Sequence, residues 1–226
     1  MTIDPSTSSS AAQNAVTAVD IVLEPDATMI QNATAANAGL LKNFPNGFAL
    51  GDEHAPHMSV IGGYFYTSGL DETFAAAAKV LASEKIMTWK LTAFKYYYMP
   101  LKEIGLGGIS VQPTADLIRL QQELFEAIGK FMAPASSGSA AAFATTPANP
   151  EINQPTMDAV ATYFAAHRGE NYTPHVTIGV GTVAYLDELL AAPFPTFTFS
   201  PAAASAYQFG NFGTAAKLLH SFTLTQ

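Results

Sequence analysis

The sequence has no cysteine, so it offers no disulfide, no thiolate nucleophile and no cysteine-based zinc site. It also has few basic residues: 10 Lys and Arg stand against 18 Asp and Glu, a net charge of −8. Proteins that hold long RNA usually carry a basic surface, because neutralising successive phosphates supplies most of the affinity. The composition therefore argues against long RNA and favours a small phosphate-bearing ligand.

Long apolar runs are missing as well. No stretch approaches the roughly 20 residues of a membrane-spanning helix, although 49% of the 226 residues are hydrophobic. A chain of this length can bury a sizeable core as one domain or two small lobes. We expect a soluble monomer without a membrane partner. By default it is cytoplasmic, and an exported form whose signal peptide has been removed stays open.

The first 16 residues are rich in Ser, Ala and Thr and lack the basic and apolar regions of a signal peptide. We predict a disordered leader over 1–16 and a single domain over 17–226. Within that domain, the Ala-, Ser- and Pro-rich segment 133–155 shows little periodicity, which is typical of a surface linker between lobes.

Apolar spacing predicts alternating strands and helices elsewhere. Helices are expected over 26–44, 68–84, 114–132, 156–167 and 183–190. Strands are expected over 18–23, 57–66, 87–98, 109–111, from 175 onward, and over 194–200, 203–209 and 217–224, the last three as closing antiparallel strands. We also expect a capping box at Ser68 and Asp71 and a turn at Gly105–Gly108. The order strand, helix, strand, strand, helix, strand recurs loosely in each half, which predicts an α+β fold.

Two short segments repeat each other: Pro56-His57-Met58-Ser59-Val60 and Pro174-His175-Val176-Thr177-Ile178. Side chains alternate along a strand, so His57 shares a face with Ser59, and His175 shares a face with Thr177. The glycines further along each strand are expected on the same faces, where they either open a pocket or allow close packing. If the strands meet, two imidazoles and two hydroxyls converge. The alternative is two buried strands that each begin at an edge proline.

This pair of His-x-Ser/Thr-x motifs resembles the 2H phosphoesterases, a family that includes 2′-5′ RNA ligase-like proteins and 2′,3′-cyclic nucleotide phosphodiesterases. The resemblance covers the chain from about Ala18 onward. It implies two pseudo-symmetric lobes, each with an antiparallel sheet and flanking helices, around a central cleft. It also implies that His57 and His175 are the catalytic pair and that Ser59 and Thr177 bind the phosphate, with neither metal nor other cofactor.

The chemistry suits these residue types. Histidine populates both protonation states near neutrality, so one can act as general base and the other as general acid, and a hydroxyl can stabilise charge on a phosphate oxygen. The family resemblance suggests that His175 activates water and His57 protonates the leaving ribose oxygen; the residues themselves leave the reverse open. We therefore expect hydrolysis of a small cyclic phosphate or of a 2′-5′-linked nucleotide. A non-catalytic nucleotide-binding module of the same fold is the alternative.

Two further features leave alternatives open. Tyr64, Tyr66 and Tyr172 could stack on a nucleobase, or they could fill the core and surface of strands, where tyrosine is common. His54 precedes His57 by three residues, a spacing that metal ligands can use. Pro56 forbids a regular helix there, and only Asp52 and Glu53 lie nearby, so we expect no metal site.

Overall fold

The computed structural model describes residues 15–147 and 150–225. Residues 1–14, most of the expected leader, lie outside the described residues, and Val16 already belongs to the first strand. No helix in the described part of the chain is long and apolar enough to span a membrane.

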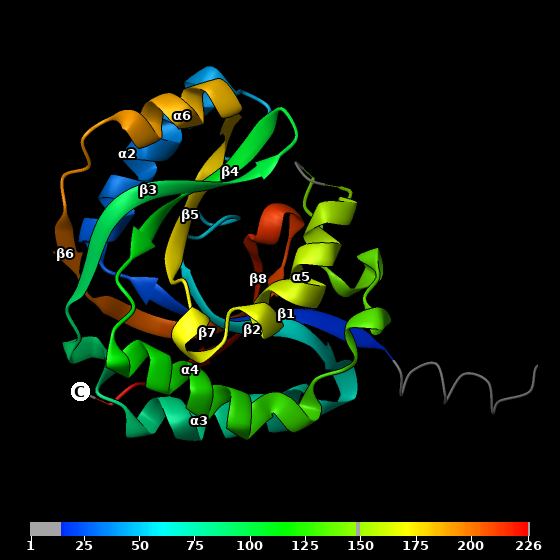
Figure 1. Ribbon diagram of the computed structural model, residues 1–226. Coiled ribbons are helices and arrows are strands. Elements are labelled where there is room, and N and C mark those ends of the chain that lie inside the picture. The colour runs from blue at the N-terminus through cyan, green and yellow to red at the C-terminus, as the bar shows by residue number, and fades with distance from the viewer. Residues whose placement is uncertain (1–14, 148–149, 226) are drawn as a thin grey trace, which may run out of the picture.

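Two antiparallel four-stranded sheets form the two lobes (Figure 1). The lower sheet in that view has the order β2 (Met58–Tyr66), β1 (Val16–Pro25), β7 (Pro201–Phe209), β8 (Ala215–Phe222). The upper sheet has the order β5 (His175–Thr182), β4 (Ile104–Val111), β3 (Leu91–Leu101), β6 (Phe197–Phe199). Each motif lies on or beside an edge strand, β2 or β5. The predicted α+β architecture with two lobes is confirmed.

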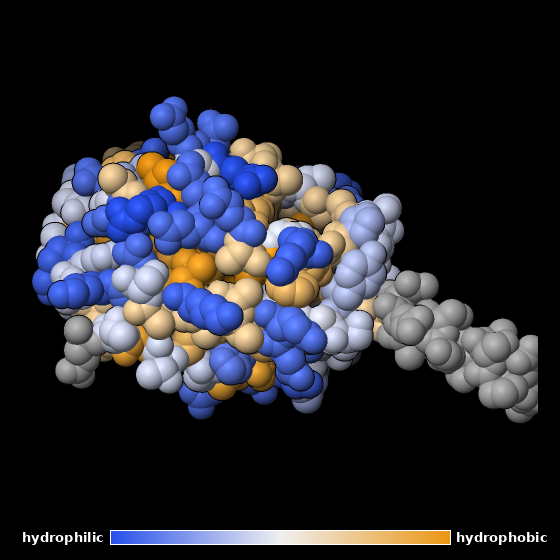
Figure 2. Space-filling view, turned by 90° about the horizontal axis from the view of Figure 1, so that it is seen from below, coloured by the Kyte–Doolittle hydropathy of each residue, from blue (hydrophilic) through white to orange (hydrophobic). Residues whose placement is uncertain are grey.

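All helices of the described chain except α5 (Gln154–Ala166) cover the outer faces of the sheets (Figure 1). Helices α2 (Ala27–Asn43) and α6 (Val183–Ala191) lie over the upper sheet, and α3 (Leu70–Ser83) and α4 (Ala115–Ile128) lie under the lower one, while α5 packs beside β2 (Figure 1). Helix α2 follows β1 of the lower sheet yet packs on β5, and α4 follows β4 of the upper sheet yet packs against β2. The chain therefore crosses between the lobes repeatedly. Seen from below, the surface is largely hydrophilic, with smaller apolar patches (Figure 2).

Helix starts follow capping rules with one exception. Asp26 accepts from the backbone N–H groups of Thr28 and Met29 at the start of α2, and Thr114 accepts from that of Leu117 at the start of α4. The capping box predicted at Ser68 and Asp71 is wrong. The turn 67–69 is instead a 3₁₀ turn that leads into α3, and its last residue has no side-chain cap. This tighter turn joins β2 directly to α3, and 3₁₀ turns are frequent at helix starts.

The segment 133–155 is not a simple surface linker. Its Ala133 N–H donates to the Tyr64 carbonyl at 2.8 Å, and its Ala144 N–H donates to the Phe209 carbonyl at 2.8 Å. Phe143 is buried, and its ring meets that of Tyr64 edge to face. Small alanines and one aromatic ring thus cover part of the lower sheet without helical periodicity.

The last three strands do not form one closing unit. Strand β6 pairs with β3 in the upper sheet, whereas β7 and β8 complete the lower one. The chain changes sheets at Ser200, whose backbone N–H donates to Asp26 Oδ2 at 2.8 Å and whose carbonyl accepts from the Asp26 N–H at 2.8 Å.

The turn predicted at Gly105–Gly108 is also wrong, because all four residues belong to β4. Their missing side chains leave room for neighbours: a Cβ at Gly108 would collide with the Tyr97 ring, and one at Gly105 would reach Tyr98 and Leu186. The turn lies earlier, at Lys102, which has a positive φ of 66°.

We expect Gly108→Ala to lower the free energy of unfolding by about 1–3 kcal/mol, because the Tyr97 ring must move in a closely packed lobe. Urea unfolding measures this loss. Gly129→Ala is the matched control, since a Cβ there would meet nothing within 4 Å. Equal stability of the two variants would show that β4 tolerates side chains on this face.

Candidate active site

Both motif strands carry the same irregularity. In the pairing of β1 with β2, Val22 faces Ser59 and Ile21 faces Ile61, so Val60 is an extra residue. In the pairing of β4 with β5, Gly108 faces Thr177 and Gly107 faces Gly179, so Ile178 is extra in the same way. Each motif is thus followed by a β-bulge directly after its hydroxyl residue.

The bulges correct the expected faces. An extra residue reverses the alternation beyond it, so residues after the bulge leave the face of the motif. Gly179 and Gly181 accordingly face α2 and α6, where a Cβ would meet Asn37, Leu40 or Leu186. These glycines serve packing against helices. Gly62 is the glycine that faces the site, since a Cβ there would meet Phe164 and Phe209.

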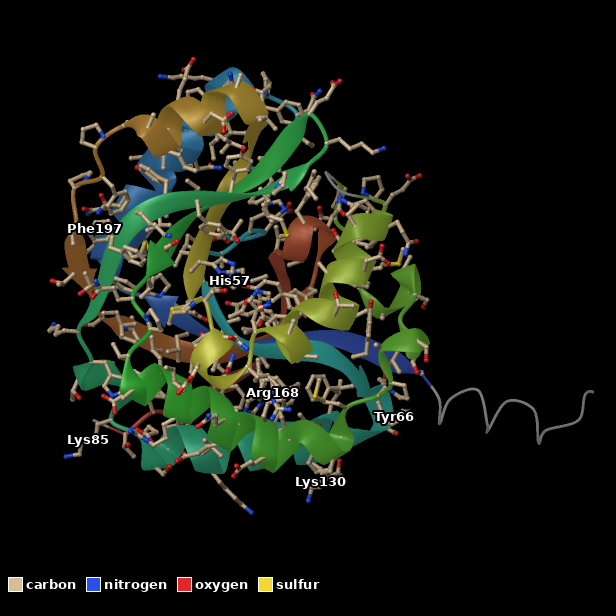
Figure 3. The ribbon with its side chains drawn as sticks, in the orientation of Figure 1. His57, Tyr66, Lys85, Lys130, Arg168 and Phe197 are labelled. Carbon is tan, nitrogen blue, oxygen red and sulfur yellow. The ribbon has the colours of Figure 1, made fainter. Side chains whose placement is uncertain are left out.

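One cavity between the sheets brings both motifs together. Its lining includes all four motif residues, His57, Ser59, His175 and Thr177. His57 lies at the centre of the molecule between the two sheets (Figure 3). Tyr172, three residues before His175, helps to join the lobes: its hydroxyl donates to the Ser59 carbonyl at 2.7 Å. The second motif is thereby tied directly to the strand of the first.

The two imidazoles are held alike. Nδ1 of His57 lies 2.8 Å from the Ala55 carbonyl, and Nδ1 of His175 lies 2.8 Å from the Thr173 carbonyl. Since a carbonyl only accepts, each Nδ1 carries a hydrogen, and Nε2 is left as the exchangeable position. A proline stands between each histidine and its carbonyl partner. Its fixed φ helps to set this local bend.

A buried carboxylate contacts the histidine and the hydroxyl of the first motif only. Asp20 of β1 is 0% exposed, and its Oδ2 accepts from the Ser59 hydroxyl at 2.6 Å and lies 3.4 Å from His57 Nε2. Among the described residues, its Oδ1 has no hydrogen-bond partner. Asp20 was not among the expected site residues. The signal that could have revealed it is a lone carboxylate inside an otherwise apolar strand.

The pKa values of the two histidines are shifted in opposite directions. Burial acts to lower the pKa of His57, but the hydrogen bond and negative charge of Asp20 outweigh it, so the pKa is raised above 6.5. His175 has no such partner, and desolvation lowers its pKa to about 4. Burial also raises the pKa of the Asp20 carboxyl, against the hydrogen bonds that it accepts. His57 therefore keeps its proton to a higher pH than His175 does.

The two hydroxyls also differ. The Ser59 proton is directed at Asp20. In the second motif, burial raises the pKa of Tyr97, and the neighbouring Thr177 side chain acts to lower it. The Tyr97 ring meets His175 edge to face, with ring centroids 4.9 Å apart. A carboxylate therefore holds the Ser59 hydroxyl, whereas the uncharged Tyr97 ring lies beside the histidine of the second motif.

Of the three tyrosines considered for base stacking, only Tyr172 lines the cavity. Tyr64 points to α5 and the segment after α4, with its hydroxyl donating to the Met157 carbonyl at 3.1 Å. Tyr66 ends β2, far from His57 (Figure 3). After the bulge at Val60, Tyr64 shares the face of Gly62, but it lies further along β2, where it meets the first turn of α5. Tyr66 lies further still from the cavity.

Apolar and aromatic residues from distant segments form the rest of the cavity wall. These residues, which sequence patterns did not single out, include Met99, Leu101, Leu106, Val160, Tyr163, Phe164, Phe209 and Phe212. The Tyr163 ring stacks on His167, with centroids 3.9 Å apart, and its hydroxyl is 3.0 Å from Thr173 Oγ1. Such a mixture of apolar walls and a few convergent polar groups is typical of small-molecule sites.

His54 is not directed at His57. Its Nδ1 lies 3.1 Å from the Ala49 carbonyl, and its ring packs on Phe48 with centroids 5.0 Å apart. Across residues 15–147 and 150–225, no three His, Asp or Glu side chains gather as a set of metal ligands.

No protein-family model and no curated protein matches the sequence. Among solved structures, TT0787 of Thermus thermophilus is similar, with a TM-score of 0.51 and 9% identity over 91% of this chain and 96% of that one. E. coli LigT complexed with ATP has a TM-score of 0.49 and 13% identity over 94% of this chain and 100% of that one. The chain shares its two-lobed α+β fold with TT0787. This likeness extends over nearly the whole chain, and at such identities it concerns the fold alone.

Proposed function

We propose that the protein is a phosphoesterase that hydrolyses a small cyclic phosphate of the 2′,3′-cyclic nucleotide type, or a 2′-5′-linked nucleotide, by acid–base catalysis between His57 and His175. One observation supports the proposal most strongly. Two histidines of the same motif line one cavity, and their pKa values are shifted in opposite directions. Groups whose environments push their pKa values apart are suited to opposite roles in proton transfer.

The proposed reaction is an in-line displacement at phosphorus. Neutral His175 takes a proton at Nε2 from water, the water oxygen forms a bond to phosphorus, and the bond from phosphorus to a ribose oxygen breaks. Protonated His57 gives its Nε2 proton, which faces Asp20 Oδ2 at 3.4 Å in the free protein, to that leaving oxygen, and the product is a phosphomonoester. Thr177 stands beside His175 as a hydrogen-bond donor for a phosphate oxygen. Proton exchange with solvent then restores both histidines.

The charge of the cavity supports a substrate with a single negative charge. All ten Lys and Arg residues lie in the described part of the chain, and none of them lines the cavity. Lys85 and Lys130 lie at the outer edge of the lower lobe (Figure 3). Arg119 is paired with Glu84 and Asp116 at 2.8 Å each. A cyclic phosphodiester carries only one charge, so it needs less compensation by cations than a phosphomonoester, which carries up to two.

Turnover of a panel of 2′,3′-cyclic nucleotides and 2′-5′ dinucleotides, with EDTA present, tests the proposal. We expect hydrolysis of at least one class and no loss of rate with the chelator. Binding of nucleotides without hydrolysis of any member would instead support a non-catalytic binding module.

Substrate length gives a separate prediction. We expect affinity to stay level or fall from a dinucleotide to a long RNA, and to change little between about 50 and 200 mM salt. The reason is that the cavity has no Lys or Arg that could neutralise phosphates and so displace the counterions of the RNA. Fluorescence anisotropy with labelled oligonucleotides of increasing length measures this. An affinity that rises steeply with length and collapses with salt would contradict it.

A further inference from the structure

Asp20 is an unusual residue for its position. It lies in β1 between β2 and β7, at the centre of a sheet whose neighbouring residues in β1 are apolar and fully buried. A buried carboxylate is costly unless it is paired, and its only charged partner within hydrogen-bonding range among the described residues is His57. We infer that Asp20 is a positioning residue that keeps His57 protonated and so gives two alike motifs different roles. This inference rests on the proposed function.

The pseudo-symmetry of the lobes supplies the comparison. Gly62, five residues after His57, pairs with Asp20. Val180, five residues after His175, pairs with Leu106. Leu106 therefore holds the position in the second lobe that Asp20 holds in the first. The equivalent position therefore holds a carboxylate, Asp20, in the lobe of His57 and an apolar side chain, Leu106, in the lobe of His175.

The contacts of the hydroxyls follow the same asymmetry. Ser59 donates its proton to Asp20 Oδ2 and thereby fixes the carboxylate beside His57. The Ser59 hydroxyl is then part of the support for the acid, while the neighbour of Thr177 in the second motif is the uncharged Tyr97. The expected role of Ser59 as a phosphate ligand becomes one of holding Asp20.

The titratable groups that face the pair come from four elements: Glu24 on β1, Tyr207 on β7, Tyr172 before β5, and His175 on β5. None of these is a Lys or Arg that would compete with His57 for Asp20. Tyr207 donates to Glu24 Oε1 at 3.0 Å. Of the groups that raise the pKa of His57, Glu24 has the smallest effect. Asp20 is thus the group whose removal should change the proton affinity of His57 most.

Asp20→Asn in the full chain is the test, because it keeps the shape and removes the charge. In the pH dependence of kcat/KM on a hydrolysed cyclic phosphate, the alkaline limb should move to lower pH by at least about one unit. At the pH of the wild-type limb, the rate then falls about tenfold or more. The acidic limb, which reports His175, stays in place. Glu24→Gln is the matched control, and its limbs should move by no more than a few tenths of a unit.

A purely structural Asp20 would behave differently. The variant would then be less stable or slower at every pH, with both limbs unmoved, and that result would overturn the inference while leaving the proposed function intact. If Asp20→Asn does not fold, NMR titration of the wild-type histidines decides. A His57 pKa at or below 6.5 overturns the inference, and one well above it supports the pairing with Asp20. The NMR measurement needs no substrate, so absence of turnover on the nucleotide panel counts against the proposed function alone.

Discussion

We expect His57→Ala and His175→Ala each to lower kcat/KM for a cyclic phosphate by about 10² to 10⁴, the usual contribution of a general acid or base. His57 supplies the proton for the leaving oxygen, and His175 accepts the proton of the attacking water. Both side chains line the cavity. Removing either one leaves a partner that can perform only half of the proton transfer. Steady-state kinetics of the purified variants measure the loss.

The control for these variants is His220→Ala. His220 is exposed, and its ring stacks on Phe74 with centroids 5.2 Å apart, outside the cavity. This variant should keep kcat/KM within about twofold of the wild type, as a substitution remote from the chemistry does. Circular dichroism checks that all three variants fold. Wild-type rates in both cavity variants would remove the mechanism.

The second large effect is on the pH profile. The base must be neutral, so the rate should rise with pH through the pKa of His175, about 4. The acid must be protonated, so the rate should fall through the raised pKa of His57, which lies above 6.5. We therefore expect a plateau that begins at about pH 5 and whose alkaline limb lies above the ordinary histidine pKa of about 6.5, with about tenfold changes per pH unit outside it. The limbs belong to the pair of coupled groups.

The profile is measured as kcat/KM over the pH range in which circular dichroism shows a folded protein. A rate that climbs steadily into alkaline solution would contradict a protonated acid at His57. So would an acidic limb near the ordinary histidine pKa of about 6.5, since it would mean that burial does not lower the pKa of His175.

Local patterns in the sequence predicted much of the fold. The spacing of apolar residues and the cap at Thr114 predicted α4, because both signals lie within a few residues of each other. The packing of 133–144 on the lower sheet was missed, since alanines without periodicity carry no sign of burial. The glycines of β4 were missed for a related reason: their purpose is room for Tyr97 and Leu186, which come from other segments.

The site was predictable only in part. The repeated motif named the four residues that the cavity brings together, because strand alternation places histidine and hydroxyl on one face. The bulges that reverse the later positions have no local signature. Asp20 lies 39 residues before Ser59, its hydrogen-bond donor. Its role follows from strand pairing, which the sequence of either strand alone does not reveal.

The central claim, that His57 and His175 act as one acid–base pair on a phosphodiester, is tested most directly by the double variant His57→Ala/His175→Ala. Its kcat/KM on a hydrolysed cyclic phosphate should lie close to that of the slower single variant, because groups that act as a unit are strongly non-additive. Losses that multiply across the two single variants would contradict the claim, since they would mean that each histidine contributes independently of the other.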